Sequence, residues 1–209
     1  MLDIRAWTFD DAFCDTARSA GGVHVRIARP PGAMVVLGAG SRPAVELDLD
    51  ACAADGVALY RRRGGGCAVV LDPGNVIVSV AYPAPGFGRN QAHFDAISAW
   101  LIDGLAAAGC PGVRTAGVSD LVVGDRKVAG ACLQRARDLL YYSAALLVDA
   151  NLARLERWLR HPPREPDYRA GRRHRDFVSN LASLRPVSGA AELAAALEAT
   201  LRPERLPVP

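Results

Sequence analysis

The segment SDLVVGDRKVAGACLQ, residues 119–134, contains two apolar runs separated by Gly124-Asp125. Short runs rich in β-branched residues favour strands, and a Gly-Asp pair suits the tight turn of a hairpin. This hairpin would carry Asp120 on its first strand and Lys127 near the start of the second. A carboxylate and an ammonium brought together in this way can bind phosphate, metal or a carboxyl oxygen, although an ordinary cross-strand salt bridge is the more common explanation.

Lys127 is the one lysine among 25 basic residues, and the other 24 are arginines. Arginine serves as well as lysine for solubility and surface pairing, but it cannot supply a compact ammonium of adjustable pKa. Two interpretations follow from this bias. Either position 127 requires an ammonium group, or compositional drift has left one lysine by chance.

The segment RRRGGGC, residues 61–67, lies between two expected strands. Consecutive glycines let the backbone approach a ligand and expose its N–H groups, while adjacent arginines supply positive forks for a carboxylate or phosphate. The spacing matches neither a Walker loop nor the glycine-rich turn of a dinucleotide site. The segment is therefore a candidate anion site, and the alternative is a flexible hairpin loop with solvated arginines.

The remaining pattern predicts a single α+β domain over residues 1–209, with a mostly antiparallel mixed sheet flanked by helices. Expected strands occur both before and after a central helix, and tight turns such as Asp72-Pro-Gly-Asn75 join several of them. We expect strands at residues 34–38, 57–60, 67–71, 75–82, 121–124, 127–134 and 139–149, and helices at residues 92–108, 152–160 and 190–201.

Composition limits the class of protein. The chain has 209 residues, of which 50% are hydrophobic and 22% are charged, as in ordinary globular domains. The net charge of +3 is small and the arginines are interleaved with acids, which argues against a nucleic-acid partner. The sequence contains no apolar run long enough to span a membrane, and its N-terminal stretch lacks the pattern of a secretory signal. We therefore expect a cytoplasmic protein that does not bind membranes.

The five cysteines are Cys14, Cys52, Cys67, Cys110 and Cys132. Their number is odd and they form no Cys-x-x-Cys or Cys/His cluster, which argues against a disulfide framework and a metal site. We expect reduced thiols, most of them small buried residues. The four histidines lack metal-ligand spacing, and the common nucleophile motifs are missing from the sequence.

Five blocks together resemble lipoate-protein ligase A, whose catalytic domain is shared with octanoyltransferases and biotin-protein ligases. They occur in the family's order and spacing over roughly residues 30–185, and DLVVGDRKVAG in the hairpin is the most specific part. The blocks are residues 35–48, 56–75, 119–138, 146–159 and 177–184.

The resemblance implies an enzyme that attaches a lipoyl or octanoyl group to a lysine of a lipoyl-acceptor domain. It would use lipoate or octanoate, ATP and Mg²⁺, and proceed through lipoyl-AMP. Lys127 would contact the acyl carboxylate and the adenylate phosphate, with Asp120 near the incoming amine. A separate accessory subunit or an acyl carrier protein would be further partners. The residues implied in ligand binding are Arg61, Arg62, Gly64, Gly65, Gly66, Cys67, Asp72, Asn75, Gly130 and Ser143.

The sequence also departs from the family pattern. The usual Ser-Gly-Gly-Gly is Gly64-Gly65-Gly66-Cys67, and the Arg and Gln of a GRxQN block are Ala39 and Ser41. A His-His-Gly-Thr block aligns with Tyr142-Ser143-Ala144-Ala145. These changes affect ATP use or acyl-group choice without touching Lys127. The family's acidic N-terminal helix is not evident, and we expect its accessory C-terminal domain to be absent.

Two alternatives stay open beside the ligase. An octanoyltransferase would take its acyl group from acyl carrier protein through a cysteine thioester, and a non-catalytic relative would only bind a lipoylated partner. Cys110 lies 10 positions before Asp120, too early for the nucleophile of such transferases. Cys67 and Cys132 fall on glycine and alanine positions of the family. The sequence therefore favours the adenylate route.

Overall fold

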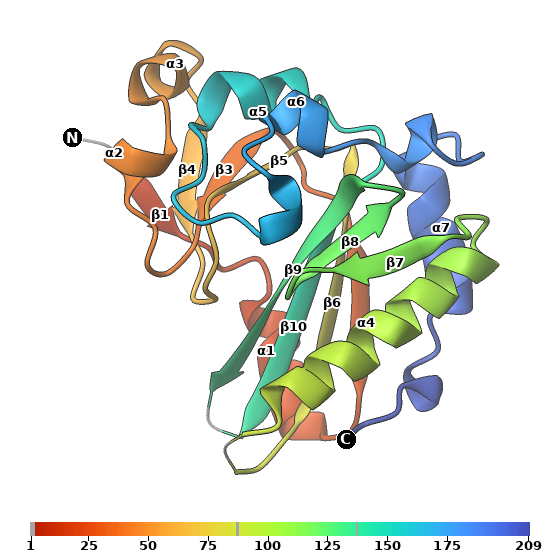
Figure 1. Ribbon diagram of the computed structural model, residues 1–209. Helices are drawn as coiled ribbons and strands as arrows, with labels where there is room; N and C mark the ends of the chain where they lie inside the picture. Colours follow the sequence, from red (N-terminus) through yellow and green to blue (C-terminus); the bar gives the residue numbers. More distant parts are fainter. Residues whose placement is uncertain (1–2, 87, 137) are drawn as a thin grey trace.

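The computed structural model describes residues 3–86, 88–136 and 138–209, so the expected domain is described except for residues 1–2, 87 and 137. Its strands are β1 (Ile4–Ala6), β2 (His24–Ala28), β3 (Met34–Leu37), β4 (Ala58–Arg61), β5 (Val69–Leu71), β6 (Asn75–Pro83), β7 (Val113–Ala116), β8 (Asp120–Val123), β9 (Arg126–Ala136) and β10 (Leu139–Leu147). They form two sheets (Figure 1).

The larger sheet has six strands in the order β2-β6-β10-β9-β8-β7, and every neighbouring pair in it is antiparallel. The smaller sheet has four strands in the order β1-β4-β3-β5. In the smaller sheet β1 and β3 both run parallel to β4, and β5 pairs antiparallel with β3. The two sheets therefore differ in pairing as well as in size.

Helices cover both sheets (Figure 1). Helices α4 and α7 pack together on the larger sheet, while α1 contacts β6 and β10. Helices α3 and α5 contact each other beside the smaller sheet, and α6 contacts β9. The helices are α1 (Asp11–Ala20), α2 (Pro43–Glu46), α3 (Leu49–Ala54), α4 (Asn90–Ala107), α5 (Ala153–Trp158), α6 (His174–Phe177) and α7 (Ala190–Thr200), with 3₁₀ turns at Asp167–Arg169, Leu181–Ser183 and Pro203–Arg205.

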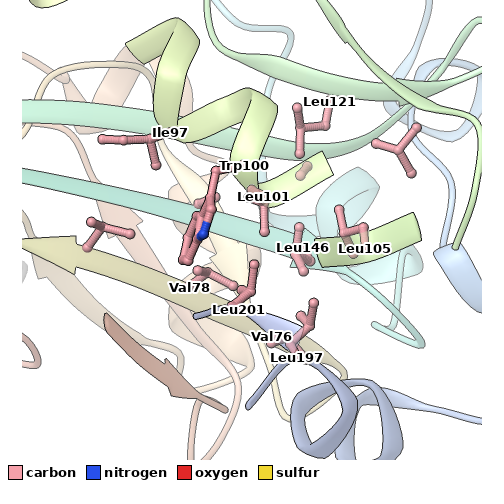
Figure 2. Packing of buried hydrophobic residues seen from close by; sticks show 14 of the residues in the cluster. Val76, Val78, Ile97, Trp100, Leu101, Leu105, Leu121, Leu146, Leu197 and Leu201 are labelled. Carbon is pink, nitrogen blue, oxygen red and sulfur yellow. The ribbon is translucent and has the colours of Figure 1, made fainter. Parts of the chain in front are cut away.

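The main core lies between the larger sheet and the pair α4 and α7. Alternate residues of β6, such as Val76 and Val78, face this core together with Leu146 of β10 (Figure 2). Leu101 of α4 and Leu197 of α7 pack against them from the other side. Because side chains alternate along a strand, the intervening residues of β6 and β10 face the opposite side of the sheet. That second face carries the candidate site.

The structure confirms the α+β class and the expected strands and main helices, with ends shifted by one or two residues. Several points differ. Strands β1, β2 and β7 and the short helices α2, α3 and α6 were not predicted. There are two sheets, since β3, β4 and β1 assemble separately from the strands that contain the predicted hairpin. The segment after β4 is not a hairpin, because β4 and β5 lie on either side of β3. An N-terminal helix, α1, is present where the sequence pattern gave no clear signal.

The turn between β5 and β6 generates a test of the fold. A Cβ at Gly74 would lie 2.5 Å from the backbone nitrogen of Ala150 and 2.6 Å from its Cα. We expect Gly74→Ala to lower the free energy of unfolding by about 1–3 kcal/mol, because backbone atoms cannot yield as a flexible side chain does. The melting temperature would fall by roughly 2–4 °C for each kcal/mol of lost unfolding free energy. Gly32→Ala is the control, since its Cβ meets no atom within 4 Å, and equal melting temperatures would contradict the prediction.

Candidate active site

A cavity of about 620 Å³ opens beside the second face of the larger sheet. Its walls come from β9 and β10, from the loop after β4, from the smaller sheet, and from the segment between α5 and α6. Most of the lining is apolar, including Val69, Ile77 and Leu147, but charged groups gather at Asp120 and Lys127. An apolar cavity with a few convergent polar groups is typical of a small-molecule site.

The hairpin of β8 and β9 forms as predicted and brings Asp120 and Lys127 together. The Nζ of Lys127 lies 2.7 Å from Oδ1 of Asp120, and the two side chains are 27% and 8% exposed. A cross-strand salt bridge thus exists, and it also lines the cavity. A Cβ at Gly130 would lie 3.1 Å from the Lys127 Nζ. The small residue at position 130 therefore leaves room for the ammonium to lie over β9.

The arginines after β4 hold the loop in place. Arg61 donates to the carbonyl oxygens of Gly38 and Ser41 at 2.9 and 3.0 Å. Arg62 donates to the carbonyls of Gly65 and Cys67 at 2.7 and 2.9 Å. The sequence predicted that these guanidinium groups bind an anion, but they donate mainly to backbone carbonyls. Arg62 lines the cavity, whereas Arg61 is not among its lining residues.

The triple-glycine loop reaches the cavity at its C-terminal end. Gly66 and Cys67 line the main cavity, and Gly64 lines a smaller adjoining pocket of about 90 Å³. Gly65 is exposed and lines neither space. A Cβ at Gly38 would lie 2.0 Å from the carbonyl oxygen of Gly66, so the loop can occupy this place only beside a glycine. Loop and hairpin therefore meet at one cavity.

Asp72 and Asn75 build the turn between β5 and β6. The carboxylate of Asp72 is buried and accepts hydrogen bonds from Arg154 at 2.9 Å and from the backbone N–H of Asn151 at 3.0 Å. Asn75 accepts from the backbone of Asp72 and donates to the carbonyl of Leu146. Asn75 lines the cavity but Asp72 does not. The polar groups of both residues are engaged within the fold.

The far end of the cavity is polar. Cys132 of β9 and Ser143 of β10 are paired in register and line both spaces together with Asp10. The Asp10 carboxylate is buried and accepts hydrogen bonds from Ser79 at 2.9 Å and Tyr141 at 2.5 Å. Burial raises the pKa of the Cys132 thiol above its ordinary value. The thiol is therefore held in its neutral form and is a poor nucleophile.

All five cysteines are free thiols. Cys52 and Cys110 are buried core residues, and burial raises the pKa of both. Cys14, Cys67 and Cys132 are only half-buried, so the expectation that most of the cysteines are buried is wrong. Cys67 and Cys132 line the cavity, a position that the family resemblance implied for Cys67 and not for Cys132.

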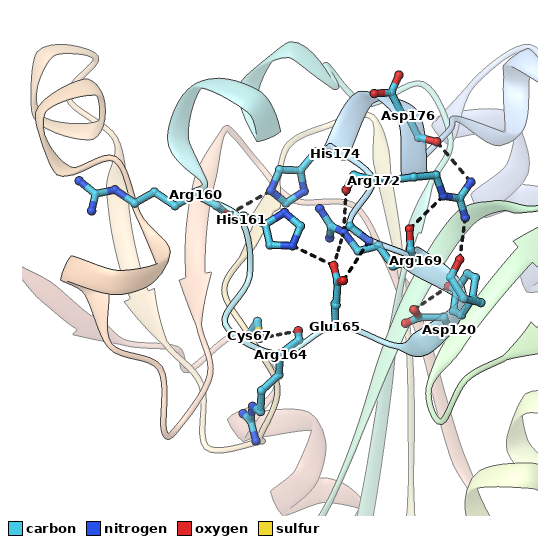
Figure 3. A network of polar contacts seen from close by, with 12 residues as sticks. Cys67, Asp120, Arg160, His161, Arg164, Glu165, Arg169, Arg172, His174 and Asp176 are labelled. Atoms are coloured by element: carbon cyan, nitrogen blue, oxygen red, sulfur yellow. Dashed lines mark hydrogen bonds and ion pairs between the residues drawn. The ribbon is translucent and has the colours of Figure 1, made fainter.

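Sequence reasoning missed the polar wall opposite the sheet. The segment between α5 and α6 contributes Glu165, Arg169 and His174 to the cavity lining (Figure 3). Arg169 is only 4% exposed, pairs with Glu165 at 3.3 Å, and its pKa is lowered by burial. Burial also lowers the pKa of His174. The one available signal was the density of arginines in this stretch, which is also common in solvated loops.

Tyr168, in the same segment, donates a hydrogen bond from its hydroxyl to Oδ2 of Asp120 at 2.8 Å. Burial and the Asp120 charge raise the pKa of Tyr168 far above its ordinary value. Its sequence context carried no sign of this contact, which spans 48 residues.

Within residues 3–86, 88–136 and 138–209, no group of three or more His, Cys, Asp or Glu side chains is placed to hold a metal ion. No helix within the same ranges has the length and apolar character needed to cross a membrane.

Comparison with known proteins identifies the family. The family model described as "Lipoyl protein ligase A/B catalytic domain" matches residues 4–202. The chain belongs to this family. It is 32% identical over 147 residues to lipoate-protein ligase A of Psychrobacter cryohalolentis, a match that covers 70% of this chain and 42% of that protein. The chain thus spans less than half the length of this curated relative.

Solved structures of the family have the same fold. One belongs to a bi-partite lipoate protein ligase and its E2 lipoyl domain from Thermoplasma acidophilum, with a TM-score of 0.77, 25% identity, and coverage of 92% of this chain and 75% of that one. Another is lipoate-protein ligase A bound with ATP, with a TM-score of 0.72, 25% identity, and coverage of 91% and 75%. The α+β fold expected from the resemblance is thereby confirmed.

The close approach of Gly38 to the loop generates a test of the site. We expect Gly38→Ala to displace the Gly66 carbonyl and to reduce ligand binding at the cavity at least tenfold, because the loop backbone must move by more than an ångström. Binding of lipoate measured by calorimetry checks this. Gly40→Ala is the matched control, since no atom lies within 4 Å of its Cβ. Equal binding by both variants would contradict the prediction that the loop packs closely against Gly38.

Proposed function

We propose that this protein is a lipoate-protein ligase that activates lipoate, or octanoate, with ATP and transfers the acyl group to a lysine of a lipoyl-acceptor domain. The observation that carries the proposal is the ammonium of Lys127, paired with Asp120 at one end of a large apolar cavity. Membership of the lipoyl ligase family and the likeness to an ATP-bound ligase support it.

The geometry of β9 suggests how the acyl group lies. With the lipoate carboxylate at the Lys127 ammonium above Gly130, the chain would run along β9 towards Cys132. Cys132 is two residues beyond Gly130 on the same face, a distance of about 7 Å along a strand. Apolar neighbours such as Ala145 and Ile77 would cover the alkyl chain. The dithiolane ring would then reach the polar end beside Ser143.

The first reaction step would be attack of the acyl carboxylate on the α-phosphate of ATP, with loss of pyrophosphate. Lys127 would neutralise charge that develops on the carboxyl and phosphate oxygens, and such preorganised charges contribute large rate effects. In the second step the amine of the acceptor lysine would attack the acyl carbonyl and release AMP. Asp120 would hold Lys127 in place and lie near the incoming amine.

A magnesium ion would be held mainly by the nucleotide. Mg²⁺ often takes one or two carboxylates and fills its remaining positions with water and substrate phosphates, so a cluster of three protein ligands is not required. Both oxygens of Asp120 are engaged by Lys127 and Tyr168, so phosphates and water would supply the ligands of the ion. When bound, the ion would supply positive charge to the phosphates.

The transferase alternative is less well supported. Cys132 is half-buried, with a raised pKa, at the acyl end of the cavity and away from the Asp120–Lys127 pair. Cys67 lies on the loop after β4, and its thiol is 3.8 Å from the carbonyl oxygen of Arg164. The Arg62 charge lowers the pKa of Cys132, but burial is the larger effect and the pKa is raised overall, whereas a nucleophilic thiol is activated by an adjacent base or a lowered pKa.

The proposed acceptor is a lipoyl domain, by analogy with the structure of the T. acidophilum ligase and its E2 lipoyl domain. The bi-partite character of that ligase also makes a separate accessory subunit a candidate partner. The five free thiols fit a reducing compartment such as the cytoplasm. We therefore place the proposed reaction there.

Lys127→Arg tests the role of the single lysine. The guanidinium is larger and planar, so it should misplace the carboxyl and phosphate oxygens and reduce acyl transfer on the order of 10²-fold or more. The folded fraction should not change. Protein, lipoate, ATP, Mg²⁺ and an apo lipoyl domain are incubated together, and intact mass of the acceptor measures transfer. Transfer within a few-fold of the parent would remove Lys127 from the proposed chemistry.

Replacing Cys67, Cys110 and Cys132 together by serine distinguishes the two routes. The adenylate route predicts that transfer still occurs and still requires ATP, because no thioester forms. In the same assay, octanoyl-acyl carrier protein without ATP should give no product. Loss of transfer in the folded triple variant, with ATP-independent transfer by the parent, would favour the thioester route.

A further inference from the structure

We propose that Tyr168 is a positioning residue that holds the Asp120–Lys127 pair in the geometry needed for acyl activation. The inference rests on the proposed ligase function and assigns to that site a residue from outside the hairpin. Tyr168 lies in the 3₁₀ turn Asp167–Arg169, within the segment that supplies Glu165 and Arg169 to the cavity wall.

Tyr168 and Lys127 bind the two oxygens of one carboxylate. The tyrosine hydroxyl donates to Oδ2 of Asp120 at 2.8 Å, and the lysine ammonium lies 2.7 Å from Oδ1. The Asp120 side chain is 8% exposed, so water has little access to replace either partner. A carboxylate fixed through both oxygens cannot rotate freely, and the direction in which it holds the ammonium is set.

The tyrosine acts as a donor over the whole working pH range. Burial, followed by the negative charge of Asp120, raises its pKa far above the ordinary value of a phenol. The hydroxyl therefore stays protonated, and its one proton is directed at the carboxylate. A charge-assisted hydrogen bond of this kind is stronger than one between neutral groups.

Packing fixes the ring of Tyr168. Its centroid lies 5.2 Å from that of Phe177, with the planes tilted by 43°. On another side, a Cβ at Gly117 would lie 3.5 Å from the tyrosine Cε1, and Gly117 adopts a φ of +58° that favours glycine. These neighbours restrict the ring and direct its hydroxyl towards Asp120.

The backbone of Tyr168 is tied to the same hairpin through Arg172. The guanidinium of Arg172 donates to the carbonyl of Tyr168 at 2.9 Å and to the Asp125 carboxylate at 2.8 Å. Asp125 lies in the turn between β8 and β9. The segment is therefore joined to the hairpin at its turn by Arg172 and at its catalytic end by Tyr168. This two-point attachment is what a positioning role requires.

Removal of the hydroxyl should affect the chemical step more than substrate binding. Without Tyr168, Asp120 can turn and draw the ammonium away from the position of the acyl carboxyl group. We expect Tyr168→Phe to lower kcat about tenfold, which corresponds to about 1.4 kcal/mol, because hydrogen bonds to charged groups have this strength. The KM values for lipoate and ATP should change little, since the hydroxyl contacts neither substrate.

Tyr82→Phe is the matched control. The hydroxyl of Tyr82 also makes one hydrogen bond of 2.8 Å, but its partner is Nδ1 of His93 and neither Asp120 nor Lys127. Both variants lose a tyrosine hydroxyl and one hydrogen bond of the same length. A merely structural role for Tyr168 predicts equal kinetics for the two variants.

A double-mutant cycle identifies the route of the effect. If Tyr168 acts through Asp120, then Tyr168→Phe should have little further effect in a background that carries Asp120→Asn. Independent action predicts that the two losses in kcat multiply. Multiplying losses, or an unchanged kcat in Tyr168→Phe alone, would overturn the proposal.

The single lysine allows a test that does not depend on ligase activity. Trace acetylation followed by peptide mass spectrometry reports the reactivity of Lys127 against that of the α-amino group. We expect Tyr168→Phe to raise the relative reactivity severalfold, because the ammonium is held less firmly, and Tyr82→Phe to leave it unchanged. If the parent protein shows no ligase activity but the labelling difference is found, the proposed ligase function is refuted and the positioning role is retained. Equal labelling in all three proteins would refute the positioning role.

Discussion

The pairing of β9 with a neighbour on each side is the constraint on which the site depends. β8 pairs with its first half and brings Asp120 to Lys127, while β10 pairs along most of its length and sets Ala145 beside Gly130 and Ser143 beside Cys132. A register slip of one residue would send these side chains to the opposite face. The core prevents such a slip, because it buries the intervening residues of β10 against α4 and α7.

Arginine and lysine have separate tasks in this molecule. The guanidinium groups of Arg61 and Arg62 have several fixed donors, and each arginine bonds to several backbone carbonyls that fold the loop after β4. Lys127 has one compact ammonium with one carboxylate partner, and it lies over a glycine. The bias of the sequence towards arginine therefore fits a division of tasks. The arginines hold the loop, and the single lysine, as proposed, contacts the reacting oxygens.

The hairpin, the glycine loop and most of the strands could be predicted because their signals are local. Turn residues and alternating apolar runs lie within about ten positions of one another. The division into two sheets could not be predicted, since the choice of β3 as common neighbour of β4 and β5 depends on contacts far apart in sequence. Tyr168 was missed for the same reason. Helix α1 is amphipathic, but it was missed because it is short and its average hydrophobicity is low.

The fold also clarifies the departure from the family at the start of β10. Of the four residues that align with the His-His-Gly-Thr block, Tyr142 and Ala144 face the main core, whereas Ser143 and Ala145 face the cavity. The change at position 142 therefore concerns packing against α4, where the Tyr142 ring meets Phe94 at 5.3 Å. The change at 143 lies beside Cys132 and Asp10, at the end away from Lys127. Loss of a larger side chain there would enlarge the acyl end, so under the proposed function this departure bears on acyl-group choice and leaves the nucleotide chemistry at Lys127 intact.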